Sequence, residues 1–120
     1  MTDLWVNPAV GVAGDMLLAA LVDAGADLDA VRSSIAALDV PGWTIEPERT
    51  TRRGLVALRL VVSTAEDHHH RSWSTIDSLL ESAALPEPVR AGARSTFRRL
   101  AVAEAQVHGI AIDEVHFHEV

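Results

Sequence analysis

Two histidines near the end of the sequence have the residue type and the spacing of a metal-binding pair. His116 and His118 flank Phe117, and the chain has no cysteine, so a transition metal must be bound through imidazole or carboxylate. In an extended segment, residues two apart point to the same face, with their Cα atoms about 6.5–7 Å apart. The two imidazoles can then chelate one divalent ion while Phe117 packs into the core behind them. In a helix they would diverge by about 200°, and a polar strand without a ligand is the alternative interpretation.

Three further histidines stand together in the middle of the chain. His68, His69 and His70 follow a pair of acidic residues and precede Arg71. So many donors in one loop can capture a metal loosely or hand it on, and a solvated loop in which Arg71 balances the acidic pair is the alternative. His108 stands alone at the expected end of a helix, where the helix dipole favours a cation, and we assign it a structural role.

A glycine-containing turn near the start of the chain is the candidate site for an anionic ligand. Gly11 and Gly14 lie between a short apolar run and a longer one, with Asp15 directly after them. This order is typical of a strand, a tight turn and the start of a helix, where backbone N–H groups and the positive end of the helix dipole converge. A plain tight turn also needs such glycines. Asp15 is expected either to hold a metal, orient a ligand or act as a base, or only to stabilise the first turn of the helix.

The composition restricts the kinds of protein that this chain can be. Its 120 residues suffice for a hydrophobic core, and we expect a single domain over residues 1–120. The formal net charge of −7 argues against a surface that binds nucleic acid. The longest apolar stretch is far short of a membrane span, and no signal peptide stands at the N-terminus. The expected location is therefore the cytoplasm, with no membrane partner.

The pattern of apolar residues predicts an α+β fold, in which a small, at least partly antiparallel sheet has helices packed on one face. The expected order of elements is β-α-α-β-β-α-α-β. Residues 3–7 are expected to form a short buried strand, and residues 14–24 a helix that is apolar on most sides and hence buried. A second helix, capped by Asp27 or Asp29, is expected to end near Leu38.

Period-two alternation follows the second helix and predicts a β-hairpin with one buried side. Trp43 and Ile45 point one way, and Arg52, Arg53 and Gly54 form the turn. The residues of the second strand that are expected to face the core beside them are Val56, Leu58, Leu60 and Val62.

Two helices and a strand are expected in the rest of the chain. A helix over residues 73–83 is capped by Ser72 or Ser74, and a longer helix ends at Gly109. The apolar stripe of this longer helix is expected at Val89, Ala93, Phe97, Leu100 and Val107. Residues 110–120 are expected to form the final strand.

Taken together, these motifs resemble the LarC family of nickel-insertion proteins. The resemblance covers essentially the whole chain and rests on the strand–G-x-x-G-D-M–helix pattern, H-H-H-R after a hairpin, V-H-G at a helix end, and V-H-F-H-E-V. It implies a nickel chelatase, or cyclometallase, of the lyase class, which acts on pyridinium-3,5-bisthiocarboxylic acid mononucleotide and makes the nickel-pincer cofactor of lactate racemase. Such proteins form one nickel–carbon bond and two nickel–sulfur bonds to the pincer ligand, and they require CTP with Mg²⁺ or Mn²⁺.

The chain departs from the family pattern in its first loop and in its length. Asn7 stands where the family has Asp, and Val10 and Ala13 stand where it has Ser. The family's proteins are also much longer, and the portion that the resemblance associates with CTP lies beyond V-H-F-H-E-V. We therefore expect this chain to be an N-terminal fragment of a longer nickel-insertion protein. The fragment is expected to bind no CTP and to be inactive alone. Its expected partners are the pincer-ligand mononucleotide and the C-terminal part, and a homo-oligomer is left open.

The resemblance also assigns roles to the candidate residues. Gly11, Gly14 and Asp15 would bind the phosphate or a carboxylate of the mononucleotide. The histidines at 116 and 118, with the run at 68–70, would deliver nickel. Asp15, Glu119 and His116 are the candidates for the base that removes the ring proton that nickel replaces. The alternative is a non-catalytic metal-binding or assembly module whose chemistry lies in the missing C-terminal part.

Overall fold

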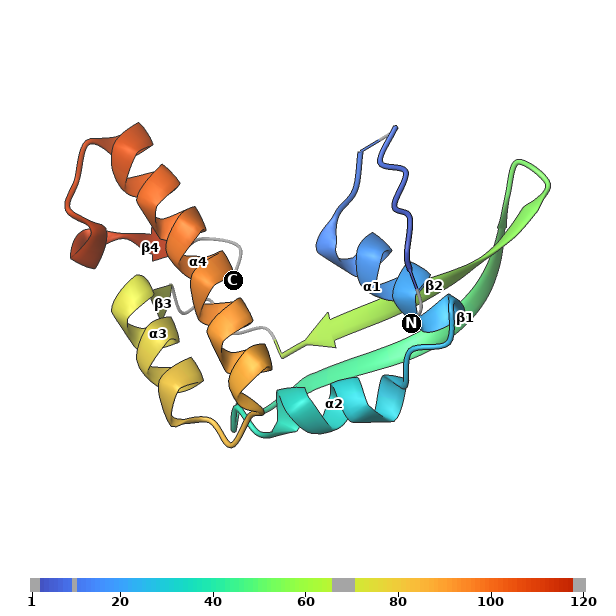
Figure 1. The fold of residues 1–120 in the computed structure, drawn as a ribbon, viewed down its shortest axis with the longest axis horizontal. Coiled ribbons are helices and arrows are strands. Elements are labelled where there is room, and N and C mark those ends of the chain that lie inside the picture. Colours follow the sequence, from blue (N-terminus) through green and yellow to red (C-terminus); the bar gives the residue numbers. More distant parts are fainter. Residues whose placement is uncertain (1–2, 10, 66–70, 118–120) are drawn as a thin grey trace. The chain divides into compact units, whose positions relative to one another are not determined.

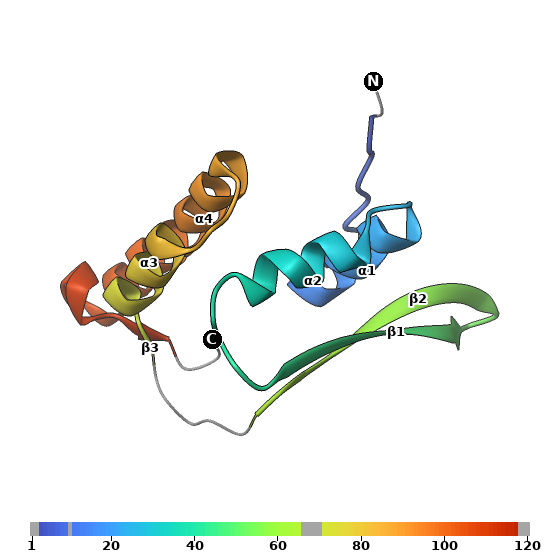
Figure 2. The ribbon, with the colours of Figure 1, turned by 90° about the horizontal axis from the view of Figure 1, so that it is seen from below.

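The computed structural model describes residues 3–9, 11–65 and 71–117, and it has the expected α+β composition (Figure 1, Figure 2). Its elements in chain order are α1 (Gly14–Asp23), α2 (Leu28–Ala36), β1 (Trp43–Arg52), β2 (Leu55–Thr64), β3 (Arg71–Ser72), α3 (Trp73–Ser82), α4 (Glu87–His108), the 3₁₀ turn η1 (Ile112–Glu114) and β4 (His116–Phe117). The α+β class and the order of elements from α1 onward are confirmed. None of the described helices is both long and apolar enough to cross a bilayer.

The chain forms two compact units. We call the first the hairpin unit, which comprises residues 1–30 and 42–65, and the second the helical unit, which comprises residues 31–41 and 66–120. Each unit has its own buried residues, and each is described separately below. The organisation of residues 1–120 as a single domain stays a prediction.

The sheet of the hairpin unit is an antiparallel pair of strands, β1 and β2, joined by a two-residue turn (Figure 1). Arg53 and Gly54 occupy the turn with φ values of 50° and 80°. Positive φ at both central residues is typical of the turn whose twist matches that of the flanking strands, and glycine is favoured there because it has no Cβ. The predicted hairpin and its turn are therefore confirmed.

The register of the hairpin places the expected apolar residues on one face, but only the middle of that face is buried. Ile45 pairs with Val62, and Leu60 pairs with Pro47. Ile45 and Leu60 are buried, whereas Val56 and Val62 are exposed, so their predicted burial is wrong. The helix α1 packs against β2 but is too short to cover it. A ten-residue helix spans about 15 Å, whereas a ten-residue strand spans about 33 Å.

The first segment of the chain differs from the prediction. Residues 3–8 form no strand, and the side chain of Trp5 is 90% exposed. A strand requires a neighbour that pairs with its backbone groups, and the described residues provide none here. The predicted burial of the following helix is also wrong, because Ala19 is the only buried residue of α1. The start of α2 is as expected, since the carboxylate of Asp27 accepts the N–H groups of Asp29 and Ala30 at 2.9 and 3.3 Å.

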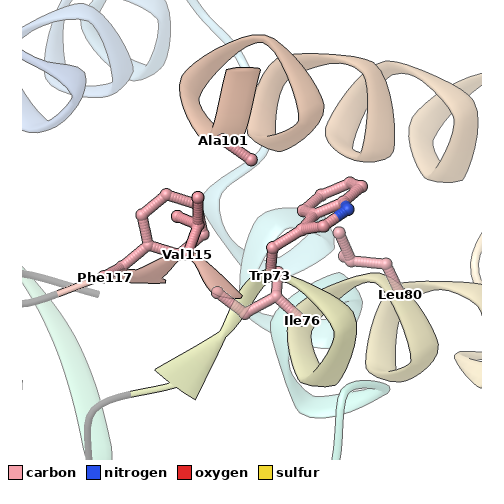
Figure 3. Packing of buried hydrophobic residues seen from close by; sticks show 6 residues of the cluster. All are labelled: Trp73, Ile76, Leu80, Ala101, Val115 and Phe117. Carbon is pink, nitrogen blue, oxygen red and sulfur yellow. The ribbon is translucent and has the colours of Figure 1, made fainter. Parts of the chain in front are cut away.

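The helical unit has one hydrophobic core, formed by α3, α4 and the segment around β4 (Figure 3). The hydroxyl of Ser72 accepts the N–H of Thr75 at 3.2 Å, which identifies Ser72 as the N-cap of α3. The rings of Phe97 and Phe117 pack at 6.2 Å between centroids with an interplanar angle of 58°. The buried members of the core are Trp73, Ile76, Leu80, Ala101, Val115 and Phe117.

The row of α4 residues that packs into the core agrees with the predicted stripe only at Ala93 and Phe97. Its members are spaced by four residues and are Ala93, Phe97, Ala101 and Ala105. The predicted members Val89, Leu100 and Val107 are exposed. These three lie about 100–120° around the helix from Ala101, at 100° per residue, so they share a different face. Three of these four residues are alanines, whose small side chains allow α3 and α4 to approach closely.

The end of the described chain is less regular than the predicted strand over residues 110–120. The turn η1 occupies Ile112–Glu114, and only His116–Phe117 form a strand, in which Ser72 pairs with His116 and Arg71 with Phe117. The extended conformation predicted around His116 is therefore confirmed, while a strand from residue 110 is wrong. His118 and Glu119 lie outside the described residues.

Ala101 provides a test of the helix packing, because it is fully buried between α3 and α4. We expect Ala101→Leu to lower the free energy of unfolding by about 1–3 kcal/mol, since three extra carbons must fit into a filled core. Denaturation of the purified chain in urea measures this change. The matched control is Ala103→Leu on the exposed side of the same helix, for which we expect a change within about 0.5 kcal/mol. Equal effects of the two variants would contradict this packing.

An ion pair links the outer surfaces of α3 and α4. The guanidinium of Arg94 donates to both carboxylate oxygens of Asp77, at 2.7 and 2.9 Å, and a third contact reaches Glu81 at 3.4 Å. The hydrogen bonds from Arg94 lower the pKa of Asp77 below its ordinary value, and they outweigh the opposing effect of burial. The pair therefore stabilises the folded state only while Asp77 is ionised.

The pH dependence of this ion pair has a defined sign. The pKa of Asp77 is lower in the folded chain, so its contribution is complete above the unfolded value near 3.8 and is lost as the pH falls through the folded value. We expect Asp77→Asn to reduce the urea midpoint at pH 6. The difference from the parent chain should shrink as the pH falls below the ordinary carboxyl range. A difference that stays constant down to pH 3 would contradict the assignment.

Candidate functional site

An open pocket in the helical unit brings His116 close to a second histidine and two glutamates. Its volume is about 380 Å³. The residues that line it come from α4, from η1, from β4 and from the connections between them, and they are Glu104, His108, Ile110, Glu114, Val115 and His116. Imidazole and carboxylate are the ligand types available to a chain without cysteine. The pocket is therefore the candidate metal-handling site.

The core of the helical unit determines the orientation of His116. Val115 and Phe117 are 1% and 5% exposed, and the backbone carbonyl of Val115 accepts the N–H of Trp73 at 3.1 Å. Because successive residues of an extended segment point to opposite sides, His116 must point away from the core that holds its two neighbours. His116 is accordingly exposed at the pocket.

The other pocket residues are brought to His116 by a reversal of the chain after α4. His108 is the last residue of α4, and the chain returns through η1 toward β4. Nε2 of His108 lies 3.1 Å from Oε2 of Glu104, one turn earlier on the helix. The carboxylate of Glu114 accepts the N–H of Ala111 at 3.0 Å. One glutamate thus orients the second imidazole, and the other fixes the turn beside it.

The pocket does not contain a complete set of metal ligands. Within residues 3–9, 11–65 and 71–117, no three histidine, aspartate or glutamate side chains are placed to hold one metal ion. The predicted ligands His68, His69, His70 and His118 lie outside these ranges, and their metal role stays a prediction. Of the predicted ligands, the structure describes His116 alone.

Sequence reasoning missed the partners of His116. His108 was given a structural role, and Glu104 and Glu114 were not considered. The signal for Glu104 and His108 was present, because a glutamate and a histidine four residues apart share one face of a helix. The signal for their proximity to His116 was absent, because it depends on how the chain folds back after Gly109.

The glycine-containing turn belongs to the hairpin unit. The N–H of Gly11 donates to the carbonyl of Pro8 at 2.8 Å, and Gly11 has φ +87°, which glycine adopts without strain. The chain is then extended through Ala13, the N-cap of α1, whose methyl group provides no capping acceptor. The predicted turn and helix start are confirmed, while the strand expected before them is absent.

Backbone donors remain available at the start of α1. The carboxylate of Asp15 accepts the N–H of Met16 at 2.9 Å. Among the described residues, no acceptor meets the N–H groups of Val12 and Ala13. A Cβ built on Gly14 would touch nothing within 4 Å, so there is open space beside this residue. Such an end favours a negatively charged group.

The comparisons with known proteins concern almost the whole chain. Its relatives include two proteins named "Putative nickel insertion protein". One, from Syntrophotalea carbinolica, is 42% identical over 120 residues, covering 100% of this chain and 30% of the relative. The other, from Pelobacter propionicus, is 47% identical over 112 residues, which are 92% of this chain and 29% of the relative.

A relative from a Nocardioides species has a more specific name, "Pyridinium-3,5-bisthiocarboxylic acid mononucleotide nickel insertion protein". It is 42% identical over 120 residues, which are 100% of this chain and 30% of the relative. The chain thus spans about 30% of the length of these curated relatives. No solved structure matches it. The sequence model of the nickel insertion proteins matches residues 4–120, from the first apolar segment to V-H-F-H-E-V. The chain therefore belongs to the nickel insertion protein family.

Proposed function

We propose that this chain is the N-terminal part of a protein that inserts nickel into pyridinium-3,5-bisthiocarboxylic acid mononucleotide, as a step toward the nickel-pincer cofactor of lactate racemase in the cytoplasm. The observation that carries the proposal is the family match over residues 4–120, together with the Nocardioides relative that bears this substrate in its name. The candidate pocket agrees with the proposal, because its histidines are of the ligand type that nickel accepts.

In this proposal His116 and His108 receive nickel as cargo. Two imidazoles at an open pocket bind a divalent ion weakly, because most coordination positions are left to water or to other donors. Weak binding suits a metal that must be passed on to another ligand. His118 and the run at His68, His69 and His70 are proposed as the further donors.

The turn from Gly11 to Asp15 is proposed to bind the phosphate or a carboxylate of the mononucleotide. The support is the open space beside Gly14 and the available N–H groups at the start of α1. The net charge of −7 makes backbone donors at a helix end more suitable for an anion than the surface as a whole.

The proposed chemistry replaces a ring C–H bond by a nickel–carbon bond, while the two thiocarboxylate sulfurs also bind nickel. A base must accept the proton that leaves the ring. Asp15, Glu119 and His116 are the proposed candidates. CTP and Mg²⁺ or Mn²⁺, which the family resemblance implies, are assigned to the remaining part of the longer protein, as is the lyase activity. The isolated chain is therefore proposed to bind substrates without turning them over.

Nickel titration of the purified chain tests the metal role. We expect weak binding that falls as the pH drops from about 7.5 to 5.5, because nickel requires neutral imidazole and the ordinary histidine pKa is near 6.5. His116→Ala/His118→Ala should weaken binding by about tenfold or more, because it removes two of the proposed imidazole ligands. His108→Ala should weaken it less. Isothermal calorimetry measures each affinity.

Two controls accompany the titration. His68→Ala/His69→Ala/His70→Ala is expected to have a smaller effect than the 116/118 variant. Glu48→Gln, at an exposed position of β1, should leave the affinity unchanged. Two results would contradict His116 and His118 as the main ligands. One is a nickel affinity that does not change with pH over this range, and the other is an equal loss of affinity in the 116/118 variant and the 68/69/70 variant.

Gly14→Ala tests the anion role of the turn. A methyl group at Gly14 would extend into the open space beside this residue, where we propose that the phosphate binds. We expect this variant to fold as stably as the parent chain and to bind the nickel-free pincer mononucleotide about tenfold more weakly. Gly92→Ala is the matched control, because it lies within α4 and its Cβ would also meet nothing within 4 Å.

The same measurement distinguishes the alternative function. A non-catalytic metal-binding or assembly module would bind nickel but not the nickel-free mononucleotide. The observation behind this alternative is that the described residues contain no complete set of metal ligands, so the chemistry can lie in another part of the longer protein. Measurable binding of the mononucleotide by the parent chain, reduced in Gly14→Ala and unchanged in Gly92→Ala, would exclude it.

A further inference from the structure

An apolar groove lies along α1 in the hairpin unit, outside the proposed nickel pocket. Its volume is about 330 Å³, and its walls come from residues 4–8, from the turn at Gly11 and from one side of α1. None of the side chains that line it carries a charge, although 22% of the residues of the chain are charged. The large apolar side chains of the lining are Leu4, Trp5, Val6, Val12, Met16, Leu17 and Leu21.

Several of the large apolar side chains that line the groove are exposed. Trp5 is 90% exposed, Leu4 63%, and both Val12 and Met16 51%. These side chains adjoin one another around one groove, whereas isolated exposed apolar residues are ordinary. A contiguous patch of this kind marks a surface that contacts another polypeptide.

The helix beside the groove supports the same conclusion. The sequence of α1 is apolar on most sides, which is typical of a helix enclosed by protein. Among the described elements of the hairpin unit, β2 packs against α1, and Ala19 is the only buried residue of this helix. The remaining apolar side is therefore suited to a second layer of protein.

We propose that the groove is the docking surface for the remaining, C-terminal part of the longer nickel insertion protein, which contributes an apolar segment that covers Trp5 and Met16. The matched region is only 30% of the length of the relatives, so more than two thirds of such a protein lies outside it. A second copy of this chain is a poorer occupant, because the net charge of −7 opposes self-association.

Docking at this groove has a consequence for the neighbouring turn. Gly11 and Val12 belong both to the groove and to the turn that precedes α1. A segment seated in the groove would therefore shield the start of α1 from bulk water and strengthen the hydrogen bonds made there. The inference itself rests on family membership and on the groove, and it holds whether or not the chain binds nickel.

Co-purification tests the docking. The chain is co-expressed with the part of the Nocardioides relative that lies beyond the matched region. We expect the parent chain to capture this part, and Leu4→Glu to reduce the captured amount about tenfold or more, because a carboxylate would be buried unpaired. Leu55→Glu is the matched control, since Leu55 is 74% exposed in the same unit but does not line the groove. The Leu55→Glu variant should capture as much of the C-terminal part as the parent chain does.

Hydroxyl-radical footprinting provides a second measurement that does not require the separate part to be soluble. Trp5 and Met16 are labelled in the isolated chain and in a single polypeptide in which residues 1–120 replace the matched region of the relative. We expect strong labelling of both residues in the isolated chain and protection in the longer protein, with Leu55 labelled equally in both. An unchanged nickel affinity in Leu4→Glu would show that docking and metal binding are separate properties.

Three results would overturn the proposal. The first is equal capture by Leu4→Glu and Leu55→Glu, and the second is equal labelling of Trp5 and Met16 in the short and the long polypeptide. The third is a dimer of the isolated chain that Leu4→Glu dissociates, which would make the groove a contact between copies.

Discussion

Burial of Val115 and Phe117 on both sides of His116 is the constraint on which the candidate nickel pocket depends. Both side chains are inserted into the core between α3 and α4 (Figure 3). The alternation of an extended segment then leaves the imidazole no orientation except outward. The pairing of His116 with Ser72, the N-cap of α3, fixes the same segment from the other side. The packing of apolar residues thus positions the polar one.

The sequence predicted most of the local structure because local chemistry determines it. Asp27 and Ser72 accept N–H groups at the starts of α2 and α3, and Arg53 with Gly54 makes the two-residue turn of the hairpin. The outward position of His116 could be predicted for the same reason, since it requires only an extended segment with apolar neighbours. These features depend on residues a few positions apart.

Burial could not be predicted as well, because it depends on distant partners. The apolar pattern of α1 indicates burial but does not say whether the covering residues belong to this chain. On α4, the apolar residues Val89, Leu100 and Val107 share an exposed face, and the row that packs into the core consists of Ala93, Phe97, Ala101 and Ala105. The proximity of His108 to His116 likewise follows from the reversal after α4, which spacing alone does not reveal.

Nuclear magnetic resonance of the imidazole nitrogens, during addition of substoichiometric Ni²⁺, tests most directly whether nickel binds at this pocket. A bound paramagnetic ion broadens the signals of the nearest imidazoles first. We predict that the signals of His116 and His108 disappear together at the lowest Ni²⁺ concentration, with those of any further donors. Loss of other histidine signals while both of these stay sharp would contradict it.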